Sequence, residues 1–204
     1  MNFKIVLWLA VFFIVLGWSA WRPHDYPTWW LETIPALVAL LILVLTRKRF
    51  PLTSLAYWLI LIHAIILMVG GHYTYAEVPV GDWIRDITGG ARNNYDKLGH
   101  LAQGFIPAII AREILIRHRV VAVRGWLAFI VVSVCLAISA FYELLEWWVA
   151  LWSEEAAESF LGTQGYVWDT QSDMFLAMIG AILALVLFSR LHDKQIHALT
   201  ATRD

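Results

Sequence analysis

Six long apolar segments constrain this chain more than any other feature of its sequence. A helix needs about 20 mostly apolar residues to cross a membrane. Lipid offers the backbone no hydrogen-bond partners, and the sequence shows no barrel-like alternation, so each segment is predicted to be helical. We therefore predict an all-α polytopic membrane protein, with residues 1–204 forming a single domain built as a bundle of six transmembrane helices. The predicted spans are residues 3–20, 29–46, 52–71, 98–117, 126–150 and 170–190.

The composition agrees with this fold class. Hydrophobic residues make up 60% of the chain and charged residues 15%, whereas soluble domains carry about 45–50% and about 25% respectively. The formal net charge of −1 gives no basic field for nucleic acid, so membrane lipid is the expected partner and nucleic acid is not. The single cysteine, Cys135, excludes an intrachain disulfide and argues against a cysteine-based metal cage.

The orientation follows from basic and aromatic residues at the span ends. Cytoplasmic loops carry an excess of lysine and arginine, and tryptophan gathers at membrane interfaces. The basic residues follow spans two, four and six: Arg47, Lys48, Arg49, Arg117, Arg119, Arg124, Arg190, Lys194 and Arg203. The tryptophans of the opposite ends are Trp18, Trp21, Trp29, Trp30, Trp83, Trp147, Trp148, Trp152 and Trp168. Both termini are therefore predicted to be cytoplasmic.

The loop between spans three and four is predicted to contain a short interfacial helix. In "EVPVGDWIRDITGGARNNYDK", Trp83, Ile84 and Ile87 share one helical face and Asp82 lies on the other. Such a segment lies in the plane of the membrane surface. The glycine pair at 89–90 is expected to end it.

Three spans carry polar pairs near their outer ends. Residues three or four apart share a helix face, and three pairs have this spacing: Asp96 and His100, Glu143 and Glu146, and Asp169 and Asp173. With a rise of about 1.5 Å per residue, all lie within about two turns of the outer surface. Ionisable groups at membrane depth are costly and usually face the bundle interior. We therefore predict one acidic site facing the outer side.

Crowded carboxylates need a cation among them. Lys97, Arg92, protons, a metal or a substrate head group are the candidates, and carboxylates with one imidazole suit a divalent metal ion. The predicted metal ligands are His100, Glu143, Glu146 and Asp173. The predicted catalytic residues are His100, Asp96 and Glu143, with His100 or Asp96 as general base. The predicted substrate or head-group contacts are Arg92, Lys97, Gln103, Asp169 and His72.

A structural interpretation stands beside this one. Asp96 and Asp169 are also suited to capping helix N-termini, and the two glutamates to holding helices together. Glu32 is expected to interact with a helix dipole, His63 to be a hydrogen-bonded core histidine, and Glu113 to pair with Arg117.

The same stretches resemble a known family over nearly the whole chain. "GGHYTYAEVP", "YDKLGHLAQGF", "YELLEWW" and "GTQGYVWDTQSDMFLAMIGA" are similar to the uncharacterised bacterial inner-membrane family typified by YjdF. More distantly, Asp96, Lys97, His100, Glu143 and Asp173 resemble a pattern of VanZ-like membrane proteins, although the Asn that usually follows the last Asp there is absent here. The resemblance implies a multi-pass protein of the bacterial inner (cytoplasmic) membrane, with the acidic site facing the periplasm. It brings no established activity, although VanZ-like proteins are linked to envelope and glycopeptide phenotypes.

Three functions are open at this stage. The first is a metal-dependent enzyme acting on a lipid or lipid-linked envelope substrate. The second is a cation- or proton-coupled transporter, which is disfavoured because the acidic residues stop in the outer third and only His63 lies deeper. The third is a non-catalytic ligand-binding membrane subunit. The sequence fixes neither the substrate nor the oligomeric state.

Overall fold

The protein is all-α over the residues that its computed structural model describes, which are 3–123, 125–152 and 166–201. The fold class is as predicted, although Arg124 and Arg203, used above for the orientation, lie outside the described residues. The elements are α1 (Phe3–Ser19), α2 (Tyr26–Thr46), α3 (Ser54–Tyr73), the 3-10 helix η1 (Tyr75–Glu77), α4 (Pro79–Thr88), α5 (Tyr95–Arg117), α6 (Gly125–Trp152) and α8 (Asp169–Ala201).

Six of these helices overlap the predicted spans, with α8 extending to Ala201, beyond the predicted end at residue 190. Among the described residues, four helices are long and apolar enough to qualify as membrane spans by length and composition. These four are α2, α3, residues Gly125–Leu151 of α6, and α8. Helix α1 is apolar but has only 17 residues. Helix α5 begins at Tyr95, three residues before the predicted start, so its first turn includes Asp96 and Lys97. The chain is thus a multi-pass membrane protein by these criteria.

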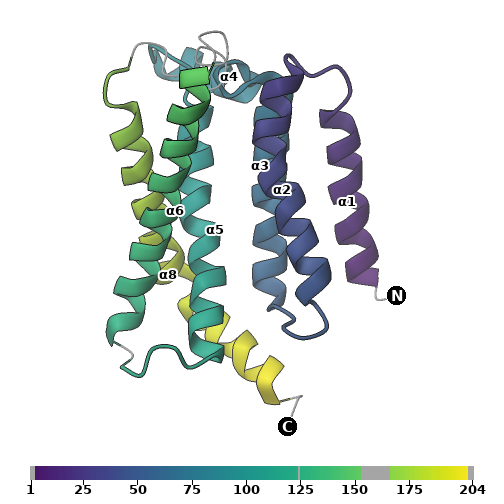
Figure 1. The fold of residues 1–204 in the computed structure, drawn as a ribbon, viewed down its shortest axis with the longest axis vertical. Helices are drawn as coiled ribbons and strands as arrows, with labels where there is room; N and C mark the ends of the chain where they lie inside the picture. Colours follow the sequence, from purple (N-terminus) through teal and green to yellow (C-terminus); the bar gives the residue numbers. More distant parts are fainter. Residues whose placement is uncertain (1–2, 124, 153–165, 202–204) are drawn as a thin grey trace.

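The long helices run side by side, and α4 lies across one end of the bundle (Figure 1). Both ends of the described chain lie at the opposite end of the bundle (Figure 1). Helix α5 packs against α3, α6 and α8, while α3 also packs against α1 and α2. The core is therefore shared between two central helices, α3 and α5.

Small residues bring α5 and α8 into direct backbone contact. A Cβ added at Gly104 would overlap the backbone of Ala177, and one at Gly180 would overlap Leu101 O. Ala177, Gly180 and Ala181 are all buried on α8. This is the close helix packing that small residues four apart allow in membranes.

The turn between α4 and α5 is held by a buried asparagine. Asn93 Nδ2 donates to Val78 O (2.9 Å) and to Asp82 Oδ1 (3.1 Å), and Asn93 Oδ1 accepts from Tyr95 N (3.0 Å). Helix α4 matches the predicted interfacial helix and ends at Thr88, followed by the cap residue Gly89, whose φ of +67° suits glycine. These contacts fix where α5 begins, and hence where its first polar residues lie.

The far end of the bundle is fastened by Glu113, which is completely buried. Its carboxylate accepts from Thr53 N (3.0 Å), from Thr53 Oγ1 (2.8 Å) and from Arg117 Nη1 (2.7 Å), so the predicted pair with Arg117 is confirmed. His192 Nε2 lies 3.1 Å from the same carboxylate. A buried charge of this kind is tolerated because its lone pairs are satisfied.

Candidate functional site

The predicted polar pairs come together at the end of the bundle that α4 covers. Helix α5 supplies Asp96, Lys97, His100 and Gln103, α6 supplies Glu143 and Glu146, and α8 supplies Asp169 and Asp173. The tight α5–α8 contact and the packing of α6 against both helices bring these residues together. They form two adjoining groups, a rim of ion pairs and a deeper His–carboxylate group.

The rim holds two cations among three carboxylates. Lys97 Nζ donates to Asp169 Oδ1 (2.8 Å) and to Asp173 Oδ1 (2.9 Å), and lies 3.7 Å from Asp96 Oδ2. Arg92 donates to Asp96 and, at 3.0 Å, to Asp169 Oδ1. Lysine and arginine are therefore the cations that hold these three acids together.

An aromatic ring covers the rim. Lys97 Nζ lies 5.3 Å and Arg92 Cζ 5.6 Å from the centroid of the Tyr166 ring. Cations at this distance are attracted to the ring face. Tyr166 OH also shares a hydrogen bond with Ser172 Oγ (2.9 Å), which ties the ring to α8.

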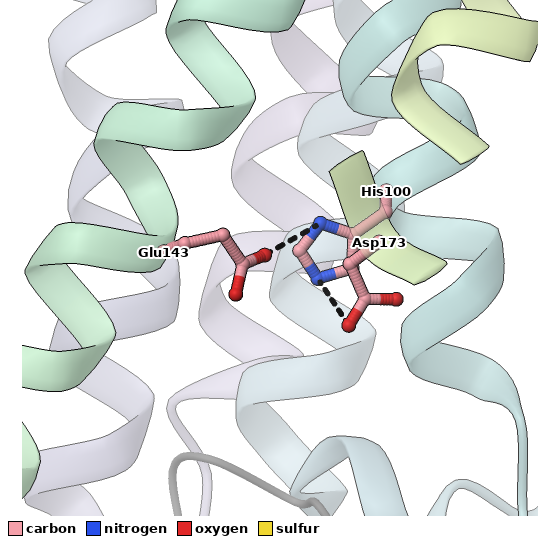
Figure 2. Close-up of side chains that lie close together, drawn as sticks. All are labelled: His100, Glu143 and Asp173. Atoms are coloured by element: carbon pink, nitrogen blue, oxygen red, sulfur yellow. Dashed lines mark ion pairs between the residues drawn. The ribbon is translucent and has the colours of Figure 1, made fainter. Parts of the chain in front are cut away.

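The deeper group consists of His100, Glu143 and Asp173, one from each of three helices, with their side chains pointing toward one another (Figure 2). His100 Nδ1 lies 3.7 Å from Glu143 Oε1, and His100 Nε2 lies 3.8 Å from Asp173 Oδ2. Each of the three residues offers one ligand atom such that all three atoms lie within 4.8 Å of one another. Asp173 joins the two groups, because its other oxygen accepts from Lys97.

Glu143 is the least satisfied member of the deeper group. The residue is 8% exposed, and its Oε1 atom is buried with no hydrogen-bond partner in the described part of the chain. A buried carboxylate oxygen without a partner is costly. A cation or a hydrogen-bond donor placed at Oε1 would therefore stabilise the Glu143 carboxylate.

His100 is oriented by Gln103. The His100 Nδ1 atom lies 3.2 Å from Gln103 Oε1, which as a carbonyl oxygen accepts a hydrogen from Nδ1. That tautomer leaves the Nε2 lone pair directed toward the Asp173 side. An imidazole whose second nitrogen is hydrogen-bonded in this way is typical of metal-binding histidines.

A cavity of about 290 Å³ lies beside this group. Its polar lining includes Asp96, His100, Gln103, Glu146 and Asp173. Glu146 thus faces the same space as His100 but stands outside the close group of three. Asp169, Arg92 and Lys97 belong to the rim instead.

Besides His63, three further polar residues line the cavity that the sequence did not assign to a site. Glu32 is buried, rather than serving only as a dipole partner, and accepts a hydrogen bond from Tyr142 OH (3.4 Å). Tyr75 and Tyr142 are the other two. His63, expected in the core, also lines the cavity.

The Tyr75 ring reaches the cavity because α3 and α5 each have a glycine, Gly70 and Gly99, where the ring packs against them. A Cβ at Gly70 would lie 2.8 Å from Tyr75 Cδ2, and one at Gly99 would lie 2.9 Å from Tyr75 Cε1. The ring therefore fits between α3 and α5 only beside glycine. Thr74, just before it, has a φ of +62°, a conformation that is strained for a β-branched residue.

His72 lies apart from this cluster. Its Nδ1 atom is 3.0 Å from Ser19 O, and its ring centroid is 4.5 Å from that of Trp18. The backbone of His72 also accepts from His24 N (2.8 Å). These contacts hold the α1–α2 connection against α3. His72 therefore lies at that connection and not among the residues of the predicted site.

The comparisons with known proteins establish the family. A family model described as "Predicted membrane protein (DUF2238)" matches residues 4–194. The chain belongs to this family. It is similar to the inner membrane protein YjdF of Escherichia coli (strain K12), with 52% identity over 190 residues, which are 93% of this chain and 90% of that protein. The predicted resemblance to the YjdF family is thus confirmed, while the VanZ-like resemblance stays a prediction. No solved structure matches the chain.

Proposed function

We propose that this chain binds one divalent metal ion through His100, Glu143 and Asp173 and uses it on the head group of a lipid or lipid-linked substrate. The observation that carries the proposal is the convergence of one imidazole and two carboxylates within 4.8 Å, with Glu143 Oε1 buried and unpartnered among the described residues. Since Nδ1 of His100 faces Glu143 and Nε2 faces Asp173 (Figure 2), metal–ligand bonds of about 2.0–2.6 Å require these side chains to turn so that both carboxylates reach one ring nitrogen.

The metal belongs on the His100 side of Asp173. A second group of carboxylates, Asp96, Asp169 and Asp173, is equally compact. Lys97 and Arg92 already occupy that group with direct ion pairs. The deeper group has no lysine or arginine in direct contact with Glu143 within the described residues, so a divalent ion would balance its charge.

A bound divalent ion would supply a Lewis acid that polarises a phosphoryl or acyl oxygen, or activates a water molecule. Glu146 lines the cavity but stands outside the metal group, so we assign it the role of proton acceptor beside the substrate. This assignment replaces His100 and Asp96 as general base. His100 would be a ligand, and Asp96 is held by Arg92.

The cavity is also shaped for an amphipathic molecule. Its lining mixes both kinds of side chain on the same helices: α2 contributes Glu32 and Pro35, and α6 contributes Tyr142 and Glu146 together with the apolar residues Ile138, Phe141 and Leu145. Helices α2 and α6 are not among the extensively packed pairs of the described chain and meet through the Tyr142–Glu32 hydrogen bond (3.4 Å), and Phe141 of the cavity lining is 55% exposed. A substrate whose chain leaves between α2 and α6 would keep that chain in lipid and its head group at the site.

The membrane arrangement that fits this role has six spans, with both termini cytoplasmic and the acidic site facing the periplasm. Support comes from the two ends of the described chain, which lie at the same end of the bundle (Figure 1). Helix α4, with its exposed apolar residues Trp83, Ile84 and Ile87, lies at the other end. Both features are expected of an even number of crossings with an interfacial helix on the outer side.

The test is equilibrium binding of Mn²⁺ and Zn²⁺ to the purified chain in detergent, followed by elemental analysis. We expect about one ion per wild-type chain and at least about tenfold weaker binding for Glu143→Gln, comparable to the loss that even an outer-shell change causes. Glu77→Gln removes the same charge from a carboxylate that is 61% exposed and serves as the control. Binding that is absent in the wild type, or unchanged in Glu143→Gln, would contradict the proposal.

Turnover is tested separately, by incubating the metal-loaded protein with membrane lipid extract and analysing the products by mass spectrometry. Loss or modification of one lipid class that depends on Glu146 supports the enzyme. Metal binding with no product would favour the transporter or the ligand-binding subunit instead.

A further inference from the structure

A second cavity lies at the opposite end of the bundle, among α1, α2 and α3. Its volume is about 360 Å³, and most of its lining is apolar or aromatic. The principal lining residues are Trp8, Leu9, Leu40, Leu43, Tyr57 and Trp58. None of these residues lines the cavity of the acidic site, and we call this second cavity the α1–α3 groove.

The groove exists because α1 packs on α3 and makes no extended contact with α2 in the described chain. Trp8 forms part of its lining. The Trp8 indole N–H donates to Tyr57 O (2.8 Å), and its ring stacks on Phe12 with centroids 5.5 Å apart. Because the one polar group of the indole is satisfied within the protein, the surface offered to the groove is apolar.

Two basic residues also line this groove. Lys4 lies in the first turn of α1 and Arg47 directly follows α2, so both lie near the same end of the bundle. Both residues are exposed. The groove is therefore apolar along the helices and cationic at its end.

We propose that this groove binds an anionic phospholipid, with an acyl chain along Leu40, Leu43 and Trp8 and the phosphate between Lys4 and Arg47. The charge complementarity singles out a lipid with net negative charge over a zwitterionic one. Basic pockets between transmembrane helices at the cytoplasmic side bind such head groups. This end is cytoplasmic in the arrangement proposed above, but the lipid site does not depend on metal binding at the other end.

The test is native mass spectrometry of the full chain in detergent, titrated with phosphatidylglycerol or with phosphatidylcholine. We expect the wild type to retain phosphatidylglycerol in preference to phosphatidylcholine. The double variant Lys4→Gln/Arg47→Gln should lose about tenfold or more of its affinity for phosphatidylglycerol, because each basic residue near the head group contributes to the attraction. Lys48→Gln/Arg49→Gln removes the same charge from the adjacent residues, which are not part of the groove lining, and should keep the preference.

A filling variant guards against a folding defect in the double variant. Leu40→Trp adds volume within the groove and should reduce binding of both lipids, while the thermal unfolding temperature reports whether each variant is folded. Equal loss in the Lys48/Arg49 control would show general charge attraction and overturn the site. Unchanged phosphatidylglycerol binding in the Lys4→Gln/Arg47→Gln variant would also overturn the site. So would a second copy of the chain that occupies the groove in place of lipid.

Discussion

Replacing Gly180 by alanine should destabilise the protein, although alanine is the better helix former. Gly180 lies on α8 directly against α5, where a Cβ would overlap Leu101 O and lie 2.9 Å from Phe105 N. The atoms it meets are backbone atoms, so no side-chain rotation relieves the overlap. The two helices would have to separate.

The size of the effect follows from two opposing terms. Overpacking costs about 1–3 kcal/mol, and the upper end applies because backbone has to move. Alanine gains about 1 kcal/mol over glycine in helix propensity. The net expectation is a loss of about 2 kcal/mol in the free energy of unfolding.

Gly17→Ala is the matched control on α1. A Cβ at Gly17 meets nothing within 4 Å, so only the propensity term remains, and the variant should gain about 0.5–1 kcal/mol. Both variants are measured by equilibrium unfolding of the purified protein in mixed micelles with increasing dodecyl sulfate. If Gly180→Ala is as stable as Gly17→Ala, the close α5–α8 contact described above is incorrect.

Three further predictions test the site, the far end of the bundle and the topology. Glu143→Gln should abolish complementation of any deletion phenotype while leaving the unfolding temperature nearly unchanged. Ala181→Leu, at a completely buried position, should instead lower the unfolding temperature, because the added volume strains the packing of α8 in the bundle. Full complementation by both variants would make the acidic group structural. Thr53→Ala removes the side-chain N-cap of α3 and the hydroxyl hydrogen bond to Glu113, while the backbone N–H of residue 53 still donates to that carboxylate. The variant should cost about 1–3 kcal/mol in chemical unfolding, and a neutral result would refute the role of this network. Alkaline phosphatase fused to the C-terminus should be inactive, since we place that end in the cytoplasm; strong activity would refute the topology.

The sequence predicts the fold well because the membrane restricts it. Apolar segments of spanning length allow only helices in lipid, so the helices could be located from composition alone. The polar pairs at spacings of three and four could be assigned to common faces for the same reason. The structure brings His100, Glu143 and Asp173 together as that argument requires.

What the sequence could not give is the order of contacts between helices. Glu32 and Tyr142 are 110 residues apart and meet only because α2 and α6 border one cavity. Tyr75 enters that cavity through Gly70 and Gly99; the paired glycines before it were the available signal. The sequence places His72 with the site because it lies at the outer end of span three, and its depth alone does not reveal its contact with Ser19.

The most direct test of the central claim is X-ray absorption spectroscopy at the metal edge of the Zn²⁺- or Mn²⁺-loaded protein. We expect only nitrogen and oxygen ligands at about 2.0–2.3 Å, with the outer-shell scattering of one imidazole that disappears in His100→Ala. A spectrum with no imidazole in the wild type, or one unchanged by His100→Ala, would contradict a metal held by His100, Glu143 and Asp173.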